Sequence, residues 1–273
     1  MLNSVQINSI MEYQERMPIL FIGHGSPMMA IEKSIYSNGI ETFGKKLPKP
    51  KAVLFISAHW ETRGTFVTAM ENPKTIHDFG GFPKKLYEEQ YPAIGDIELA
   101  KEVQNIIHST EVSLNYDWGL DHGCWAVMKY LFPKADVPIV ELSIDYTKPA
   151  SFHYALAKEL STLRKKGIMI IASGNVIHNL RMIDWENINT PYSGYDWAIK
   201  VHERIVGMIK NGDHQSLVNY NHLGREFQLA APTPDHFIPL LYILALQQEN
   251  DNLTIFNDSI VGGSLDMTSV MFA

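Results

Sequence analysis

Residues 52–57, AVLFIS, form an uninterrupted apolar run with the length and branched side chains of a strand that is buried on both faces. Three further runs share this character: Pro18–Ile22 (PILFI), Val137–Ile144 (VPIVELSI) and Gly167–Ser173 (GIMIIAS). A fifth run, Leu253–Ile260, mixes polar and apolar residues and is a weaker strand candidate. Strands of this kind are typical of a largely parallel sheet with helices on both faces.

Segments between these runs place apolar residues at helical spacing. They are Asp96–Ser109, Cys124–Phe132, Ser151–Lys166, Asp196–Lys210 and His236–Gln247. Ser151 is a candidate N-cap of the third segment, and Asp235 reads as a cap of the last. Strands that alternate with helices predict an α/β fold, a single-domain sandwich with a central, mostly parallel (mixed) sheet flanked by helices.

The chain is not divided by repeats or low-complexity linkers, so we expect one domain over residues 18–273 behind a polar leader at residues 1–17. The stretch Glu71–Gly95, with three prolines, is long for a simple connection and indicates a functional loop. The leader has neither a basic start nor a long apolar core, which argues against a secretory signal.

Composition narrows the classes of partner. Lys and Arg number 23 against 30 Asp and Glu, a net charge of −7, so we expect no nucleic acid partner. No apolar run reaches the length of about 18 residues that a membrane-spanning helix needs. Cys124 is the only cysteine, which excludes an internal disulfide and favours the reducing cytoplasm. The sequence also lacks nucleotide-binding glycine motifs, a G-x-S-x-G elbow and an HExxH motif.

Four histidines stand where predicted strands end or a predicted helix begins. They are His24 in GHGSP, His59 in SAHW, His178 in GNVIHN and His236 in PDHF. Ligands of open α/β sheets bind beyond the carboxyl ends of the strands, and neutral imidazole is a common metal ligand. A single histidine after a strand is nevertheless more often a hydrogen-bonded turn residue. The residues alone therefore leave open a metal site or a set of structural histidines.

Two further histidines are equally ambiguous. His122, in LDHG, is either a helix-cap residue or a pocket donor, and His77, in TIHDF, is either a solvated loop residue or a ligand contact. Cys124, between Gly123 and Trp125, reads as a small buried hydrophobe.

Six blocks in order resemble the class III extradiol ring-cleavage dioxygenase family, and in particular its 4,5-DOPA extradiol dioxygenase branch. The blocks are FIGHGSPMMA, FISAHWET, TIHDFGGFPKKLYEEQYPAIG, GLDHGCWAVMKYLFPKADVPIVELSID, ASGNVIHNLR and PTPDHFIPLLYILAL, which together extend from Phe21 to Leu246. The resemblance implies an α/β catalytic domain that opens the ring of a catechol, L-DOPA-like substrate with O₂. It also implies a small-molecule enzyme that works as a monomer or a small homo-oligomer.

The resemblance assigns roles to particular side chains. His24, His59 and His236 match the metal-ligand positions of the family. His178 matches the catalytic acid/base, a task suited to a near-neutral pKa, and is a possible fourth metal contact. His122 matches a second catalytic histidine near the substrate and oxygen. His77 and Ser26 are assigned to substrate binding.

One departure from the family pattern concerns the metal. More distant members bind their metal with two histidines and a glutamate, whereas His236 stands at the third ligand position here. Glu61 and Asp235 are the carboxylates that could take the place of that glutamate. Three neutral ligands suit Zn(II) as well as Fe(II), so the expected cofactor is one divalent metal, Fe(II) for ring cleavage or Zn(II) as bound. The alternatives are a zinc-dependent hydrolase and a Memo-like, non-enzymatic binding protein on the same fold.

Overall fold

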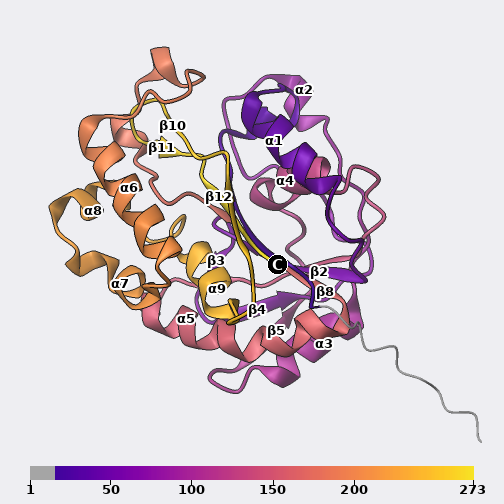
Figure 1. The fold of residues 1–273 in the computed structure, drawn as a ribbon. Coiled ribbons are helices and arrows are strands. Elements are labelled where there is room, and N and C mark those ends of the chain that lie inside the picture. Colours follow the sequence, from indigo (N-terminus) through magenta and orange to yellow (C-terminus); the bar gives the residue numbers. More distant parts are fainter. Residues whose placement is uncertain (1–15) are drawn as a thin grey trace, which may run out of the picture.

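The computed structural model describes residues 16–273, so the expected leader lies almost wholly outside the described residues. A six-stranded sheet forms the centre (Figure 1). Its order is β6 (Ile139–Glu141), β2 (Ala52–Ser57), β8 (Ile168–Gly174), β1 (Ile19–Gly23), β12 (Ser269–Phe272) and β9 (Leu253–Phe256). The first four strands run parallel, and β12 and β9 are antiparallel to their neighbours. The expectation of a mostly parallel, mixed sheet is confirmed.

Both faces of the sheet are covered because successive side chains of its strands point to opposite sides. In β1, Ile19 and Phe21 belong to one apolar core, and Leu20 and Ile22 to the other. The first core is closed by α3 (Ile97–Ile106), α5 (Ala150–Glu159), α6 (Asp196–Lys210) and α9 (Ile238–Leu246). The second is closed by α1 (Ile35–Gly44) and α4 (His122–Leu131), seen on the opposite side of the sheet in Figure 1.

Smaller elements complete the described chain. The short strands are β3 (Glu61–Thr62), β4 (Thr65–Thr68), β5 (Val112–Asn115), β7 (Ile144–Asp145), β10 (Ile260–Val261) and β11 (Leu265–Asp266). The short helices are α2 (Lys84–Tyr87), α7 (His214–Val218) and α8 (Arg225–Ala230), with 3₁₀ turns η1 (Pro27–Ala30), η2 (Leu160–Lys166), η3 (Leu180–Met182), η4 (Trp185–Asn187) and η5 (Tyr220–His222). No helix in the described part of the chain is long and apolar enough to span a bilayer.

Two expected strands are each divided. The run Val137–Ile144 forms β6 and then β7, because its backbone changes partner. Leu142 N donates a hydrogen bond to the carbonyl of Phe55 in β2, whereas Ile144 N donates to the carbonyl of Trp60. The run Leu253–Ile260 gives β9 and then β10, and Asn257 with φ 54° lies between them.

All five predicted helices form, but only one has the predicted bounds, and two of the predicted caps are wrong. α6 has the predicted bounds, and Asp96 caps α3 by accepting a hydrogen bond from Leu99 N at 2.9 Å. Ser151 does not cap its helix, because α5 begins one residue earlier, at Ala150, and Pro149 occupies the N-cap position. The predicted helix extended to Lys166, but α5 ends at Glu159 and the chain continues as the 3₁₀ turn η2. The last helix begins at Ile238 without a side-chain cap, so the expected capping role of Asp235 is wrong.

Candidate active site

Three of the predicted histidines follow three neighbouring parallel strands. His24 comes directly after β1, His59 two residues after β2, and His178 four residues after β8. β8 lies between β2 and β1, so the carboxyl ends of all three strands meet at one edge of the sheet. The His24 N–H donates to the Gly174 carbonyl at 3.1 Å, which joins the loop after β1 to the end of β8.

His236 reaches the same edge from the segment before α9. The Asn175 N–H donates to the His236 carbonyl at 2.9 Å, and the Asn175 side-chain amide donates to the His24 carbonyl at 2.6 Å. A Cβ atom at Gly174 would lie 2.2 Å from the His236 oxygen, so this approach requires glycine. Asn175 therefore links two histidines that are far apart in the sequence.

His122 is the first residue of α4, and the start of this helix is packed directly against the site. The Asp121 carboxylate caps the helix by accepting from Cys124 N at 3.1 Å and also accepts from the Ser57 hydroxyl at 2.6 Å. A Cβ atom at Gly123 would lie 2.8 Å from Cδ2 of His59. Glycine at this position lets α4 bring His122 against the histidine that follows β2. Cys124 is buried, as expected.

The three expected metal ligands converge. Ring centroids are 5.1 Å apart for His24 and His59, 5.4 Å for His24 and His236, and 5.0 Å for His59 and His236. The Nε2 atoms of His24 and His59 are 2.9 Å apart. Two nitrogens bound at about 2.1 Å to one ion, at a near-right angle, would be separated by roughly 3 Å. The spacing therefore fits neighbouring ligands of a shared cation.

His122 belongs to the same cluster, closer than the resemblance implies. Its ring centroid is 3.9 Å from that of His59. Ligand atoms of His24, His59 and His122 all lie within 4.8 Å of one another, and His178, Asp235 and His236 form a second group of this kind. The structure thus gathers five of the predicted histidines at one centre, whereas Glu61 belongs to neither group.

The surroundings of His24 and His59 favour neutral imidazoles. Burial, followed by the proximity of the other histidines, lowers the pKa of His24 and of His59 well below the ordinary value. Neutral imidazole has the free lone pair that a metal ion requires. His24 and His59 are therefore in the state that binds a divalent metal.

His178 stacks on His236, with centroids 3.5 Å apart and planes 5° from parallel. Burial, and then His236, lowers the pKa of His178 to about 3, which is far below the near-neutral value expected for this residue. At neutral pH His178 is therefore uncharged.

Two carboxylates that support the histidines were not identified as such from the sequence. Asp235 Oδ2 is in hydrogen-bond contact with Nδ1 of His236, and Asp78 Oδ2 lies 2.8 Å from Nδ1 of His122. Burial raises the pKa of both carboxyls, but contact with the adjacent histidine outweighs it and leaves both pKa values below the ordinary range. The carboxylate beside His77 in TIHDF was the only sequence signal for Asp78.

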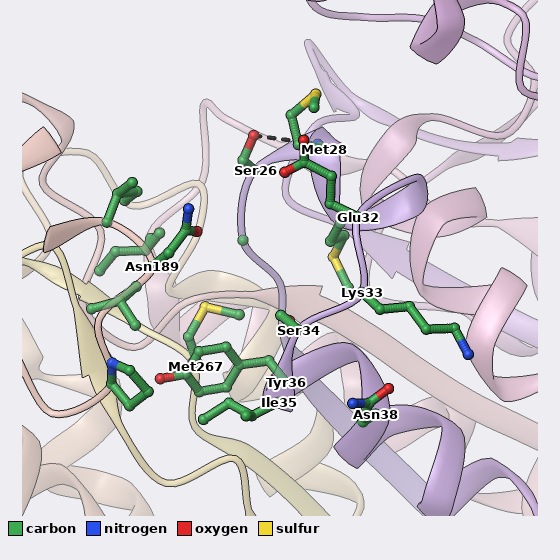
Figure 2. Close-up of a pocket in the computed structure, with 16 residues that line it drawn as sticks. Ser26, Met28, Glu32, Lys33, Ser34, Ile35, Tyr36, Asn38, Asn189 and Met267 are labelled. Carbon is green, nitrogen blue, oxygen red and sulfur yellow. Dashed lines mark hydrogen bonds between the residues drawn. The ribbon is translucent and has the colours of Figure 1, made fainter. Parts of the chain in front are cut away.

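The two residues assigned to substrate binding lie outside the histidine cluster. The Nε2 atom of His77 is 3.0 Å from the Glu89 carbonyl, and its ring contacts Phe79, which in turn packs edge-on against His122. Ser26 is the N-cap of η1, and its hydroxyl accepts a hydrogen bond from Met28 N at 3.3 Å. It lines a cavity of about 610 Å³ whose other walls include Met267 and Asn189 (Figure 2).

Residues 18–264 match the family model described as the catalytic LigB subunit of aromatic ring-opening dioxygenase. The chain belongs to the LigB family. This confirms the resemblance inferred from the six sequence blocks. Members of this family are metal-dependent dioxygenases that use O₂ on a small aromatic substrate, and this LigB-family protein is an extradiol ring-cleaving dioxygenase.

Relatives cover nearly the whole chain. It is 44% identical to a 4,5-DOPA dioxygenase extradiol from Escherichia coli K12 over 269 residues, which are 97% of each protein. It is 34% identical to the enzyme of that name from Beta vulgaris over 92% of this chain and 95% of the relative. A crystal structure of an uncharacterized Escherichia coli K12 protein superposes with a TM-score of 0.81 at 39% identity, covering 94% of this chain and 100% of the other.

Proposed function

We propose that this LigB-family dioxygenase cleaves catechols that have an amino-acid or amine side chain, with L-DOPA as the representative substrate. The observation that carries the proposal is the convergence of the His24, His59 and His236 rings, which come from three separate chain segments. His122 groups with His24 and His59, and His178 groups with His236. Similarity to several enzymes named 4,5-DOPA dioxygenase extradiol supports the choice of substrate. We further propose that residues 18–273 form one catalytic domain.

In this proposal His24, His59 and His236 hold one divalent metal. When bound, the metal supplies a point at which the two catechol oxygens and O₂ are held together and electron density passes from the ring to oxygen. We assign Fe(II) to ring cleavage and regard Zn(II) as an ion that the same ligands also bind. Three neutral imidazoles bring no negative charge of their own, but Asp235 and Asp78 are ionised directly behind the cluster. A carboxylate behind a ligating histidine raises its basicity.

The remaining histidines handle protons and orient the substrate. Neutral His178, held against His236, accepts a proton from a catechol hydroxyl and later returns it, a role that we prefer to a fourth metal contact. His122 is a second catalytic residue that faces the same centre. A carbon–carbon bond next to the diol breaks and both oxygen atoms of O₂ enter the product, which is a ring-opened semialdehyde acid.

The cavity beside Ser26 is our candidate for the substrate's side chain. Gly25 and Ser26, which follow His24, form one wall, and Leu265, which bridges to the His178 backbone, forms part of another. Figure 2 shows the Glu32 carboxylate at the same end of this cavity as the Ser26 hydroxyl. Among the described residues no basic side chain pairs with Glu32, so it is available to a protonated amine. His77, with Phe79, borders the site on the side of His122.

The test is anaerobic loading of purified protein with Fe(II), followed by O₂ and a panel of catechols that includes L-DOPA. We expect stoichiometric oxygen uptake and a yellow product, while the zinc-loaded protein and the His24→Ala variant give neither. Metal-dependent ester or amide hydrolysis without oxygen uptake would instead support the hydrolase. Absence of turnover by metal-loaded protein with every catechol would refute the proposal.

A further inference from the structure

The Asp78 carboxylate lies between two imidazoles of the cluster. Its Oδ2 atom is 2.8 Å from Nδ1 of His122 and 3.6 Å from Nδ1 of His59. Its Oδ1 atom accepts a hydrogen bond from the His122 backbone N–H at 2.9 Å. One carboxylate from the loop 71–95 therefore contacts a proposed catalytic residue twice and a proposed metal ligand once.

This arrangement determines which nitrogen of His122 carries the proton. An ionised carboxylate only accepts hydrogen bonds, so the 2.8 Å contact requires a proton on Nδ1 of His122. In the neutral imidazole Nε2 then has the free lone pair. The Phe79 ring packs edge-to-face with the His122 imidazole, with centroids 5.6 Å apart, and this contact restricts rotation of the imidazole.

An amide could not replace this carboxylate. Both oxygens of Asp78 accept from His122, one from the backbone and one from the ring. Asparagine has one acceptor oxygen and a donor NH₂ group in place of the other. Either the backbone N–H or the ring Nδ1–H would lose its partner, or the ring would shift its proton to Nε2.

A purely structural role would be to cap α4, but that helix already has a cap. The Asp121 carboxylate accepts from Cys124 N, and the contact of Asp78 with the ring adds nothing to capping. The ring contact, the orienting Phe79 and the position behind His59 all point toward the site.

We propose that Asp78 is a positioning residue that holds His122 in the tautomer protonated on Nδ1, so that Nε2 is an acceptor for the bound catechol. The same carboxylate supports His59 from behind. This inference rests on the proposed function for the role of the catechol, but the tautomer itself does not depend on turnover.

The first measurement needs no substitution in the loop. Nitrogen-15 histidine spectra of the zinc-loaded wild type, with the His122 signals assigned by their loss in His122→Gln, should show a proton on Nδ1 and none on Nε2. Finding the proton on Nε2 would overturn the proposal. A failure of the proposed function would appear differently, as absence of oxygen uptake by the iron-loaded wild type with L-DOPA.

The second measurement uses Asp78→Asn in the iron-loaded enzyme with L-DOPA and O₂. We expect kcat to fall by about 10²- to 10⁴-fold, as for other tautomer-holding carboxylates, with the metal content retained and the His122 tautomer altered. The matched control is Asp117→Asn, at an exposed position in a nearby loop, which should change nothing. A kcat within threefold of the wild type, or an unchanged tautomer with only a lower Tm, would refute the positioning role.

A double-mutant cycle tests whether Asp78 affects activity through His122. If Asp78 acts through His122, adding Asp78→Asn to His122→Gln costs no further activity. Full additivity of the two losses would show that Asp78 acts elsewhere and would contradict the proposal.

Discussion

His178 lies flat against His236, with ring centroids 3.5 Å apart and planes within 5° of parallel. The contact joins a residue four positions after β8 to one two positions before the start of α9. His178 is therefore fixed beside a proposed metal ligand. The Asp235 carboxylate is in hydrogen-bond contact with Nδ1 of that ligand, His236. The hydrogen bond to His236 favours different tasks for the two adjacent imidazoles.

Replacement of His178 by alanine should separate proton transfer from metal binding. We expect His178→Ala to retain its metal and to lose about 10²- to 10⁴-fold in kcat, the usual effect of removing an acid/base group. Metal analysis of the purified variant, together with oxygen uptake with L-DOPA, measures both quantities. A twofold effect on kcat would exclude the acid/base role, and loss of metal would make His178 a ligand.

Replacement of Asp235 by asparagine should weaken the metal site without abolishing it. The carboxylate contacts Nδ1 of His236, and removal of such outer partners typically lowers metal affinity by about 10- to 100-fold. Competition with a chelator measures the dissociation constant. His24→Ala, His59→Ala and His236→Ala should lose far more metal than Asp235→Asn, and normal metal content in all three would mean that the ligands have been misassigned.

Glu32 should select the charge of the catechol side chain. Because this exposed carboxylate has no basic partner among the described residues, Glu32→Gln should raise KM for L-DOPA by about fivefold, a modest effect typical of exposed charge pairs. KM for 4-methylcatechol, which has no amine, should not change. The matched control is Lys33→Gln, since Lys33 pairs with Glu41 at 3.3 Å. Equal changes in KM for both substrates would show that this cavity does not bind the side chain of the catechol.

The buried ion pair of Arg164 and Asp251 should be a major contributor to stability. The guanidinium donates to both carboxylate oxygens, at 2.6 and 3.0 Å, and the two side chains are 0% and 1% exposed. Asp251→Asn leaves a buried cation without its partner and should reduce the free energy of unfolding by about 3–5 kcal/mol. Urea denaturation at pH 7 tests this. As a control, Glu98→Gln breaks an exposed ion pair with Lys101 and should leave the urea concentration at the midpoint of unfolding unchanged.

His153 should make the protein less stable in mild acid. Burial lowers its pKa to about 4, and its Nδ1 atom is 3.0 Å from the Tyr242 hydroxyl. Between pH 6.5 and 4 the unfolded chain binds a proton that the folded protein does not, so stability falls as pH falls, by up to about 3 kcal/mol from this residue. Urea titrations at several pH values should give a smaller loss for His153→Gln than for the wild type. Equal slopes would show that His153 does not contribute.

Much of the architecture was predictable because it depends on local patterns. The runs at β1, β2 and β8 are continuous and apolar, so their strand character does not depend on their neighbours. The predictions were wrong where the structure of a segment depends on its hydrogen-bond partners elsewhere in the chain. The run Val137–Ile144 divides because its backbone hydrogen bonds connect first to one sheet and then to another. At the start of α5, Pro149 occupies the N-cap position that was predicted for Ser151.

The sequence by itself determined the central strands β1, β2, β6 and β8, the main helices between them, and the placement of His24, His59 and His178 just after three of these strands. Hydrophobic periodicity and chain order carry that information. Only the tertiary structure decided the partners of these histidines. Asp78 meets His122 across 44 positions, and Arg164 meets Asp251 across 87. Such pairs leave no periodic trace in the chain, because a hydrogen bond depends on where two side chains finally lie and not on their spacing in the sequence.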